Sequence, residues 1–445
     1  MKISTIVKTV LDFDVAEYVN AVRAGGRRQL DPALRGRMAD LYIDLCGVLT
    51  EAPGSIDTGE RRVLRLAELA LQSEWKLAAT TEPHDERDRP GVLEGPRGTR
   101  YQPYSNVRLL NHALGTRRHS SDVCIERQCR QALRFLVGSW LGWEERTLRG
   151  QEPWAHLDLP TARESGERLS RLSGLDDAMA AWPRLRAAGE APASRWEDYL
   201  GEAGRSRILE YLINMPQTRK HEENVFLRLI HLTEVTTSGI LARTVAANAW
   251  LESGAYAEAV HCLERAAELA VMQFDIMLVL RRTMSVDSFL GFRKDTENAS
   301  AIQMTSAQTL HIHLLGIHPA KVEALGEMQE NAFLLLYVNR HFRPLRSLLQ
   351  ELPQDTDETR PVFAAARALD EILFRWRRLH IGLAHRYLPK ETMGSGGTSG
   401  APYLSGFYHD RIFDPEGGLF PHPVPVAMPP IDERVRARSV FSPFN

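Results

Sequence analysis

Cysteine is scarce in this sequence, and the charges of the two signs nearly balance. Four cysteines among 445 residues are too few for a disulfide framework, and their spacing matches neither a zinc site nor a haem-attachment motif. The net charge of −2 gives no electrostatic reason to expect nucleic acid or an anionic membrane surface as a partner. We therefore expect a protein with free thiols that binds neither nucleic acid nor a membrane.

Long apolar runs and strand patterns are missing as well. The longest uninterrupted apolar run covers residues 332–338, which is far shorter than a membrane span. Lys8 and Asp12 interrupt the first apolar residues, so no secretory signal is visible and the expected location is the cytoplasm. No alternation of apolar and polar residues of any length appears, and this predicts an all-α fold.

Helical periodicity extends over most of the chain, with a break in composition near residues 188–194. Before the break, the sequence predicts helices at 15–24, 32–49, 60–79, 120–147 and 161–187, and a long loop at 80–106. After it, helices are predicted at 270–284, 305–315, 321–338 and 342–351, with Ser285 as an N-cap. Residues 1–190 are thus expected to form an N-terminal helical region of unknown role. Residues 195–445 are expected to form a second domain that ends in a Pro-rich tail.

The most informative stretch begins at Val362. Apolar residues recur every three or four positions between Leu369 and Tyr387, which predicts one face of a long helix. His380 lies on that face, four residues after Trp376. A histidine on an apolar helix face is most often a satisfied core residue, but it also has the placement of a metal ligand.

A glycine-rich stretch, MGSGGTSG at residues 393–400, follows this helix. Its glycines let the backbone approach a ligand closely, and Ser395, Thr398 and Ser399 add hydroxyl groups. Such a run is most often a linker, and it lacks the Gly-Lys-Ser/Thr ending of a phosphate loop. Next to His380, it is also one way to hold a metal-centred cofactor and its substrate.

Two further residues are expected to point inward. His231 shares one face of a predicted helix with Leu227. Arg293 follows the apolar residues Phe289 and Phe292 in the chain, so its guanidinium is expected to be partly buried. A buried guanidinium requires an anion, and a carboxylate fits its geometry best. Each residue also has an ordinary interpretation, as a core histidine and a surface arginine.

Five stretches in the second half of the chain resemble tryptophan 2,3-dioxygenase, a family of the haem-dependent aromatic oxygenase superfamily. They are WEDYL at 196–200, EENVFLRLIHLTE at 222–234, SFLGFRKDTENASAIQ at 288–303, WRRLH at 376–380 and MGSGGTSG at 393–400. They occur in the order of the family, and the resemblance covers residues 195–412. It implies a helical-bundle haem domain, haem b as the cofactor, and an aromatic amino acid and O₂ as substrates. It also implies a homo-oligomer, either a dimer or a tetramer.

The resemblance implies a role for each matching residue. His380 matches the proximal ligand of the haem iron, and His231 matches the distal histidine that contacts the indole N–H. Arg293 matches the residue that binds the substrate carboxylate, and Ser395 matches a loop hydroxyl that holds the amino acid end of the substrate. The other matches line the substrate pocket (Leu227, Phe289, and Trp196, Tyr199 and Leu200 from a neighbouring subunit) or the haem pocket (Ser300, Ala301, Trp376, Gly394 and Gly396).

The implied reaction inserts O₂ across the indole C2–C3 bond of L-tryptophan, or of a modified tryptophan, to give an N-formylkynurenine. Leu227 and Phe289 depart from the Phe and Tyr that are usual there, which suggests a specialised relative. One alternative is a haem-dependent monooxygenase or peroxygenase that hydroxylates an aromatic amino acid. A second is a non-enzymatic helical scaffold, because residues 249–270 resemble one tetratricopeptide unit. No second copy follows it, so a simple helical hairpin is the favoured structure there.

Overall fold

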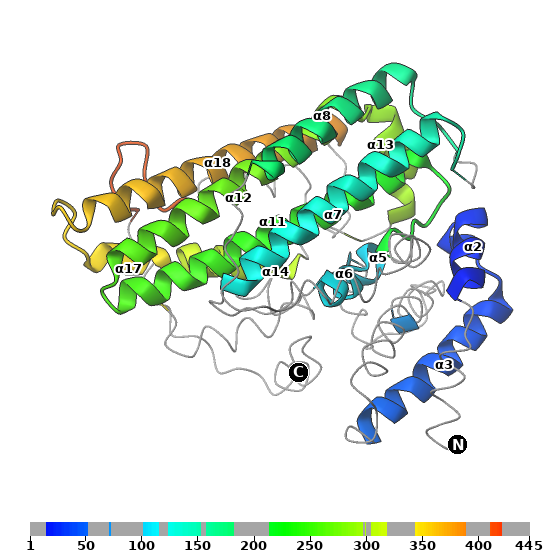
Figure 1. Ribbon diagram of the computed structural model, residues 1–445, viewed down its shortest axis with the longest axis horizontal. Coiled ribbons are helices and arrows are strands. Elements are labelled where there is room, and N and C mark those ends of the chain that lie inside the picture. Colours follow the sequence, from blue (N-terminus) through cyan, green and yellow to red (C-terminus); the bar gives the residue numbers. More distant parts are fainter. Residues whose placement is uncertain are drawn as a thin grey trace, which may run out of the picture.

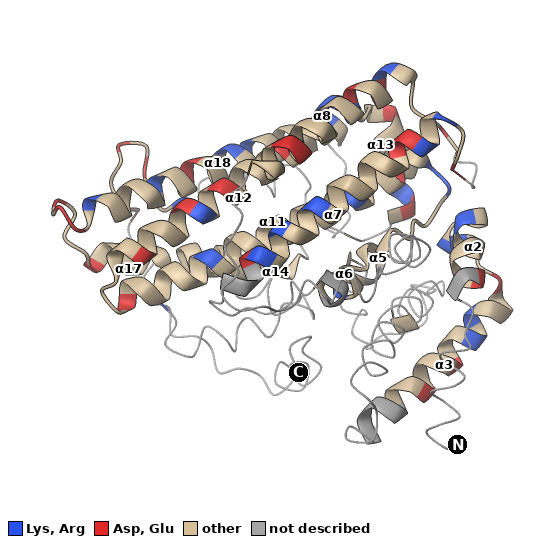
Figure 2. Ribbon diagram, viewed as in Figure 1, with Lys and Arg blue, Asp and Glu red and all other residues tan. Residues whose placement is uncertain are grey.

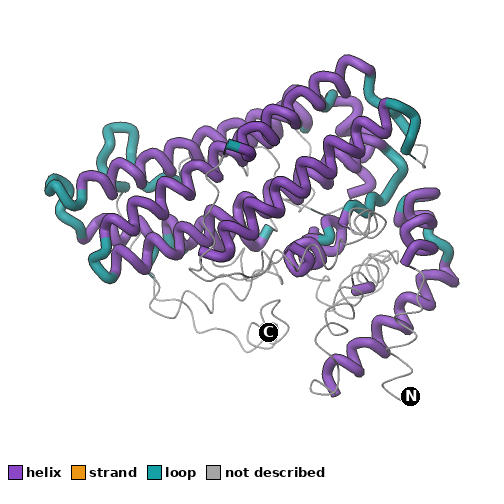
Figure 3. The backbone as a smooth tube through the Cα atoms, viewed as in Figure 1, coloured by secondary structure: helices purple, strands orange, loops and turns teal. Residues whose placement is uncertain are grey.

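The computed structural model describes residues 15–51, 71–72, 101–114, 123–152, 157–181, 213–296, 299, 304–317, 343–388 and 410–420. Within these ranges every regular element is a helix, and only two isolated bridges, Leu157–Lys220 and Phe413–Leu419, resemble strand pairing. The predicted all-α fold is therefore confirmed for the described part of the chain (Figure 3). The helix predicted at 321–338 lies outside the described residues, and so does the one predicted at 60–79, except for Leu71 and Gln72, which are helical.

The central helix of the bundle is α11 (His221–Glu252). It is buried on all sides because it packs against α7 (Val123–Leu148), α12 (Tyr256–Thr283) and α14 (Thr305–Leu315) (Figure 1). A helix without a polar face belongs in a core. Among the described residues it is also the one helix long and apolar enough to cross a membrane, but 83% of its apolar window is buried in the bundle, so this is weak evidence of a span.

α12 runs antiparallel to α11. Near the middle of both helices, Gln273 donates a hydrogen bond to the hydroxyl of Thr237 at 2.9 Å. Gly254, with a φ of 77°, occupies the tight turn that joins them. The helical hairpin favoured for residues 249–270 is thus confirmed. The separate helix predicted to start near residue 270 is wrong, because α12 continues without a break to Thr283.

α18 (Arg360–Tyr387) lies along α12 in the same direction. The guanidinium of Arg375 lies 5.0 Å from the ring centroid of Phe274, and one end of the pair is fixed by Tyr387, whose hydroxyl donates to the carbonyl of Leu280 at 3.2 Å. Since α11 and α12 are antiparallel, α18 is also antiparallel to α11 (Figure 1). This orientation determines how the residues of the candidate site face one another.

α7 and α8 (Ala162–Ala180) share the apolar core of α11 and α12. A capping box starts α8, because Thr161 Oγ1 accepts from the Glu164 amide at 3.2 Å while the Glu164 carboxylate accepts from the Thr161 amide at 2.9 Å. This start agrees with the prediction, but the helix ends at Ala180 rather than residue 187. The sequence alone assigned both helices to a separate N-terminal region, whereas their side chains pack in the core formed with residues after 213.

The predicted loop at 80–106 is wrong at its C-terminal end, where Tyr101–Ser105 form α5 and are followed by α6 (Val107–Leu114). Tyr101 and Tyr104 are buried against Leu227 and Ile230 of α11. The rest of that segment is rich in proline, glycine and charged residues, so the whole of it was predicted as a loop. The three-residue spacing of the two tyrosines, which is that of one helix face, was overlooked.

The remaining described elements are short or lie at the edge of the bundle. Figure 2 shows basic and acidic residues interspersed along the helices, without a face of one sign in that view. The elements are α2 (Val15–Gly25), η1 (Arg27–Gln29), α3 (Pro32–Glu51), α13 (Val286–Arg293), η2 (Lys294–Thr296) and α17 (Leu345–Glu351).

Candidate functional site

His380 lies in the last third of α18, with its ring against the indole of Trp376. The two ring centroids are 5.3 Å apart. Burial lowers the pKa of His380 to about 4, so the imidazole is neutral near pH 7. No described residue forms a hydrogen bond with its ring. A neutral imidazole with an available nitrogen lone pair is the form that binds a metal ion.

His231 lies inside α11, fully buried. Its Nε2 is 2.6 Å from the carbonyl oxygen of Ser105 in α5. Since a carbonyl can only accept, the proton is assigned to Nε2, which leaves Nδ1 as an acceptor. Nδ1 is buried and has no hydrogen-bond partner among the described residues. Burial lowers the pKa of His231 to about 4, so this second imidazole is neutral as well.

An aromatic bridge links the helices that carry the two histidines. Phe289 of α13 contacts Phe226 of α11, with ring centroids 5.7 Å apart, and Tyr387 of α18, with centroids 4.8 Å apart. His231 is five residues from the bridge along α11, and His380 is seven residues from it along α18. Because the two helices are antiparallel, both histidines lie on the same side of the bridge, about 8 and 10 Å along their helix axes.

Glu234 occupies the turn of α11 after His231. Its carboxylate accepts hydrogen bonds from the hydroxyls of Tyr101 at 2.9 Å and Ser306 at 2.5 Å. Burial nevertheless raises the pKa of Glu234 to about 7. The sequence placed Glu234 on the face of His231 but gave it no role, and the structure shows it in a polar contact between α5, α11 and α14.

Arg293 is the last residue of α13, which starts at the predicted N-cap. Ser285 Oγ accepts a hydrogen bond from the Ser288 amide at 3.0 Å, so the N-cap prediction is confirmed. The neighbouring Phe292 is fully buried, and Arg293 is half-buried. Burial lowers the pKa of Arg293, which agrees with the expected partial burial of its guanidinium.

The structure brings only part of the predicted site into view. Leu227 packs in the small apolar cluster with Tyr101 and Tyr104 next to His231, and Trp376 packs against His380. The roles assigned to these residues stay predictions. The other predicted site residues lie outside the described residues: Trp196, Tyr199, Leu200, Ser300, Ala301, Gly394, Ser395 and Gly396.

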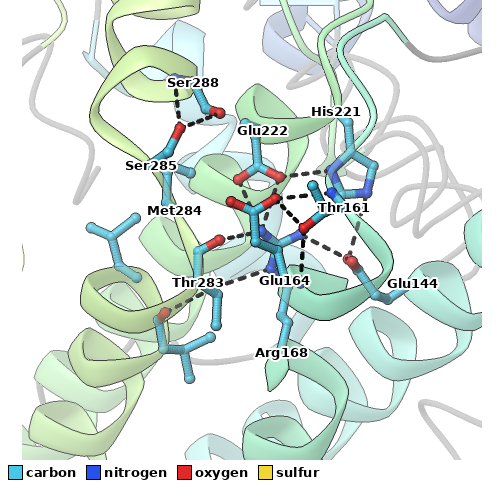
Figure 4. A network of polar contacts seen from close by, with 12 residues as sticks. Glu144, Thr161, Glu164, Arg168, His221, Glu222, Thr283, Met284, Ser285 and Ser288 are labelled. Atoms are coloured by element: carbon cyan, nitrogen blue, oxygen red, sulfur yellow. Dashed lines mark hydrogen bonds and ion pairs between the residues drawn. The ribbon is translucent and has the colours of Figure 1, made fainter. Parts of the chain in front are cut away.

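Sequence reasoning missed a buried ionic network at the start of α11 (Figure 4). Arg168 of α8 is fully buried and pairs with Glu144 at 3.0 Å and with both oxygens of Glu222 at 2.9 Å. Its Nε donates to the hydroxyl of Thr283 at 3.2 Å. His221 adjoins both carboxylates, 3.6 Å from Glu144 and 3.0 Å from Glu222. The residues of the network, Arg168 included, come from four helices, so no local pattern could have shown them.

The described residues contain no cluster of three or more His, Cys, Asp or Glu that could hold a metal ion. A haem iron can be held by a single histidine of the protein. His380, neutral and half-buried, fits that requirement.

No protein-family model, curated protein or solved structure matches this chain.

Proposed function

We propose that this protein is a haem-dependent oxygenase that inserts O₂ into the indole C2–C3 bond of L-tryptophan or a modified tryptophan. The observation that supports this most is the state of His380, a neutral, half-buried imidazole on an apolar helix face with no hydrogen-bond partner among the described residues. A core histidine normally satisfies its ring nitrogens with protein groups. A histidine that holds a metal ion would instead keep one ring nitrogen available for it.

Bound haem would supply the iron at which O₂ reacts. The protein contributes binding and orientation. His380 would hold the iron from α18. His231 Nδ1 is a buried acceptor, and the N–H of an indole is a donor of matching chemistry. Arg293, at the end of α13, would provide the positive charge for the substrate carboxylate. The apolar contacts of Leu227 would exclude water from the indole.

A spectroscopic experiment tests the proposal. Purified protein reconstituted with haem is expected to show a Soret band, and His380→Ala is expected to lose it. His385→Ala is the matched control, because His385 lies on α18 but is exposed. The absence of a Soret band in the wild-type protein would overturn the proposal. A normal Soret band in His380→Ala would contradict the assignment of His380 as the ligand of the haem iron.

Product mass separates the proposed reaction from its alternatives. Addition of two oxygen atoms to tryptophan under reducing conditions with O₂ is the expected result. Addition of one oxygen atom would instead identify a monooxygenase or a peroxygenase. We also propose a homo-oligomer, which light scattering of the purified protein would test.

A further inference from the structure

Arg377 lies one turn before His380 on α18, and the described residues do not satisfy its guanidinium. Its Nε and Nη2 atoms are buried without a hydrogen-bond partner in the described part of the chain, and so is the indole Nε1 of Trp376. No ion pair joins Arg377 to another described residue. Three buried nitrogen atoms that can only donate thus lie within one turn of the proposed haem ligand.

The side chain of Arg377 is directed into the protein. It shares one stripe of α18 with Asp370, Leu373 and Ala384, which lie seven and four residues before it and seven after it. All three of these residues are buried. A solvent-directed arginine would share its stripe with exposed residues instead.

The nearest carboxylates are already engaged. Asp370 accepts hydrogen bonds from Arg411 Nε through one oxygen and from the Ile412 amide through the other, both at 3.0 Å. Asp410 lies 3.7 Å from His311 Nε2. Burial lowers the pKa of Arg377, and the charges of Asp370 and Asp410 only partly oppose this. Neither carboxylate is within 4.0 Å of the guanidinium.

Other arginines of α18 have evident partners. Arg375 and Arg378 lie over aromatic rings, Arg360 pairs with aspartates, and two donate to backbone carbonyls. The contacts are Arg360 with Asp355 and Asp357, Arg367 with Gly417, Arg375 with Phe274, Arg378 with Phe374, and Arg386 with Arg281. Arg377 is therefore distinct within its own helix.

A guanidinium stays charged in proteins and can only donate, so the missing partner is an anion. Leaving buried donors unsatisfied is costly, and a native structure retains such a group for a reason. The planar fork of arginine matches the two oxygens of a carboxylate. The adjacent indole N–H adds one more donor of the same polarity.

We propose that Arg377 and Trp376 form a carboxylate-binding site beside His380. The Arg377 fork binds the carboxylate, and the Trp376 N–H donates to one of its oxygens. The identity of the ligand rests on the proposed function: the carboxylate belongs either to a propionate of the haem or to the amino acid substrate.

Two ligand pairs test the site and distinguish the two sources. Haemin is compared with haemin dimethyl ester, which lacks only the propionate charges. L-Tryptophan is compared with tryptamine, which lacks only the carboxylate. Haem affinity is measured from the Soret band while haem-free protein is titrated. Substrate affinity is measured from the spectral shifts of the haem-loaded protein. If the protein binds no haem, substrate affinity is measured from the change in its melting temperature.

Wild-type protein is expected to bind the charged member of one pair about 10- to 100-fold more tightly than the neutral member. In Arg377→Gln this preference is expected to fall to within about 3-fold, because the charge-assisted contact is lost. Arg377→Lys should restore part of the preference, and Trp376→Phe should lower it more weakly. Arg378→Gln is the matched control and keeps the wild-type preference.

The outcomes separate this proposal from the proposed function. If Arg377→Gln keeps the full wild-type preference in both pairs while haem binds, the carboxylate site is overturned and the oxygenase proposal stands. If wild-type protein binds no haem but its preference for L-tryptophan over tryptamine depends on Arg377, the oxygenase proposal is overturned and the carboxylate site stands. If wild-type protein prefers neither charged ligand, the carboxylate site is overturned. Arg377→Lys and Trp376→Phe keep the test decisive if Arg377→Gln fails to fold, which circular dichroism would show.

Discussion

The indole of Trp143 lies nearly parallel to the imidazole of His221, with ring centroids 4.6 Å apart and an interplanar angle of 18°. The guanidinium of Arg228 lies 4.7 Å from the centroid of the same indole. Burial lowers the pKa of His221 to about 3, so the stacked imidazole is neutral. This contact fixes the first residue of α11 against α7, next to the ionic network of Arg168.

Arg168→Ala is expected to lower the free energy of unfolding by about 3–5 kcal/mol. The substitution leaves the buried carboxylates of Glu144 and Glu222 without their counter-charge. Urea denaturation of both proteins measures the change. Arg171→Ala is the matched control, because Arg171 forms only a partly exposed pair with Glu167 in the same helix, worth at most about 1 kcal/mol. Equal effects of the two substitutions would contradict a structural role for the network.

Glu234→Gln is expected to change how stability depends on pH. The folded-state pKa of Glu234 is raised from 4.5 to about 7, so its contribution is fully present below pH 4.5 and is lost as the pH rises through 7. The variant should match wild type near pH 4 and exceed it at pH 8 by on the order of 1–3 kcal/mol. The buried His231 and His380, with lowered pKa values, destabilise both proteins alike as the pH falls. Parallel stability curves for the two proteins would refute the raised pKa.

Gly239→Ala is expected to destabilise the protein relative to Gly138→Ala. A Cβ atom on Gly239 would lie 2.9 Å from Leu269 Cδ1 and 3.4 Å from Cys129 Cβ, whereas one on Gly138 meets nothing within 4 Å. Both substitutions gain helix propensity, about 0.5–1 kcal/mol. The difference between their melting curves therefore isolates the packing cost, about 1–3 kcal/mol. A Gly239 variant as stable as the Gly138 variant would mean that the Leu269 side chain, or α7 and α12 themselves, can shift away from α11 at little cost.

Arg293→Ala is expected to raise KM for the substrate, with a loss of about 2–5 kcal/mol in binding. The reason is the loss of the charge proposed to hold the substrate carboxylate. Steady-state kinetics of the haem-loaded protein measure it, with exposed Arg282→Ala as the control. An unchanged KM would place the carboxylate elsewhere, and Arg377 is the alternative that the structure offers.

Local chemistry predicted much of the helical framework. The helix at 305–315 was predicted with its observed bounds, because apolar periodicity and its flanking residues act within a few positions. The N-cap Ser285 was predicted correctly for the same reason, since a cap bonds an amide three residues away. Helical periodicity and apolar neighbours singled out His380, His231 and Arg293, but their roles came only from the resemblance. The structure brings these three residues onto helices linked through Phe289 and its neighbours.

Contacts between distant segments could not be predicted from one sequence. Arg168 and Glu144 look like ordinary surface charges along the chain, yet both are fully buried, because their partners come from other helices. Tyr101 was assigned to a loop, but its helix depends on burial against α11 and on a hydrogen bond to Glu234. Likewise, nothing in the sequence WRRLH distinguishes Arg377 from Arg378, whereas their surroundings differ completely.

The enclosure of α11 has a consequence for biosynthesis. Its apolar sides stay exposed to water until α12 and α14 have left the ribosome. The residues between Glu252 and Leu315 take on the order of 10 s to be translated. During that interval the nascent chain presents a long apolar helix that chaperones can shield, and truncated chains that stop before α14 would aggregate for the same reason.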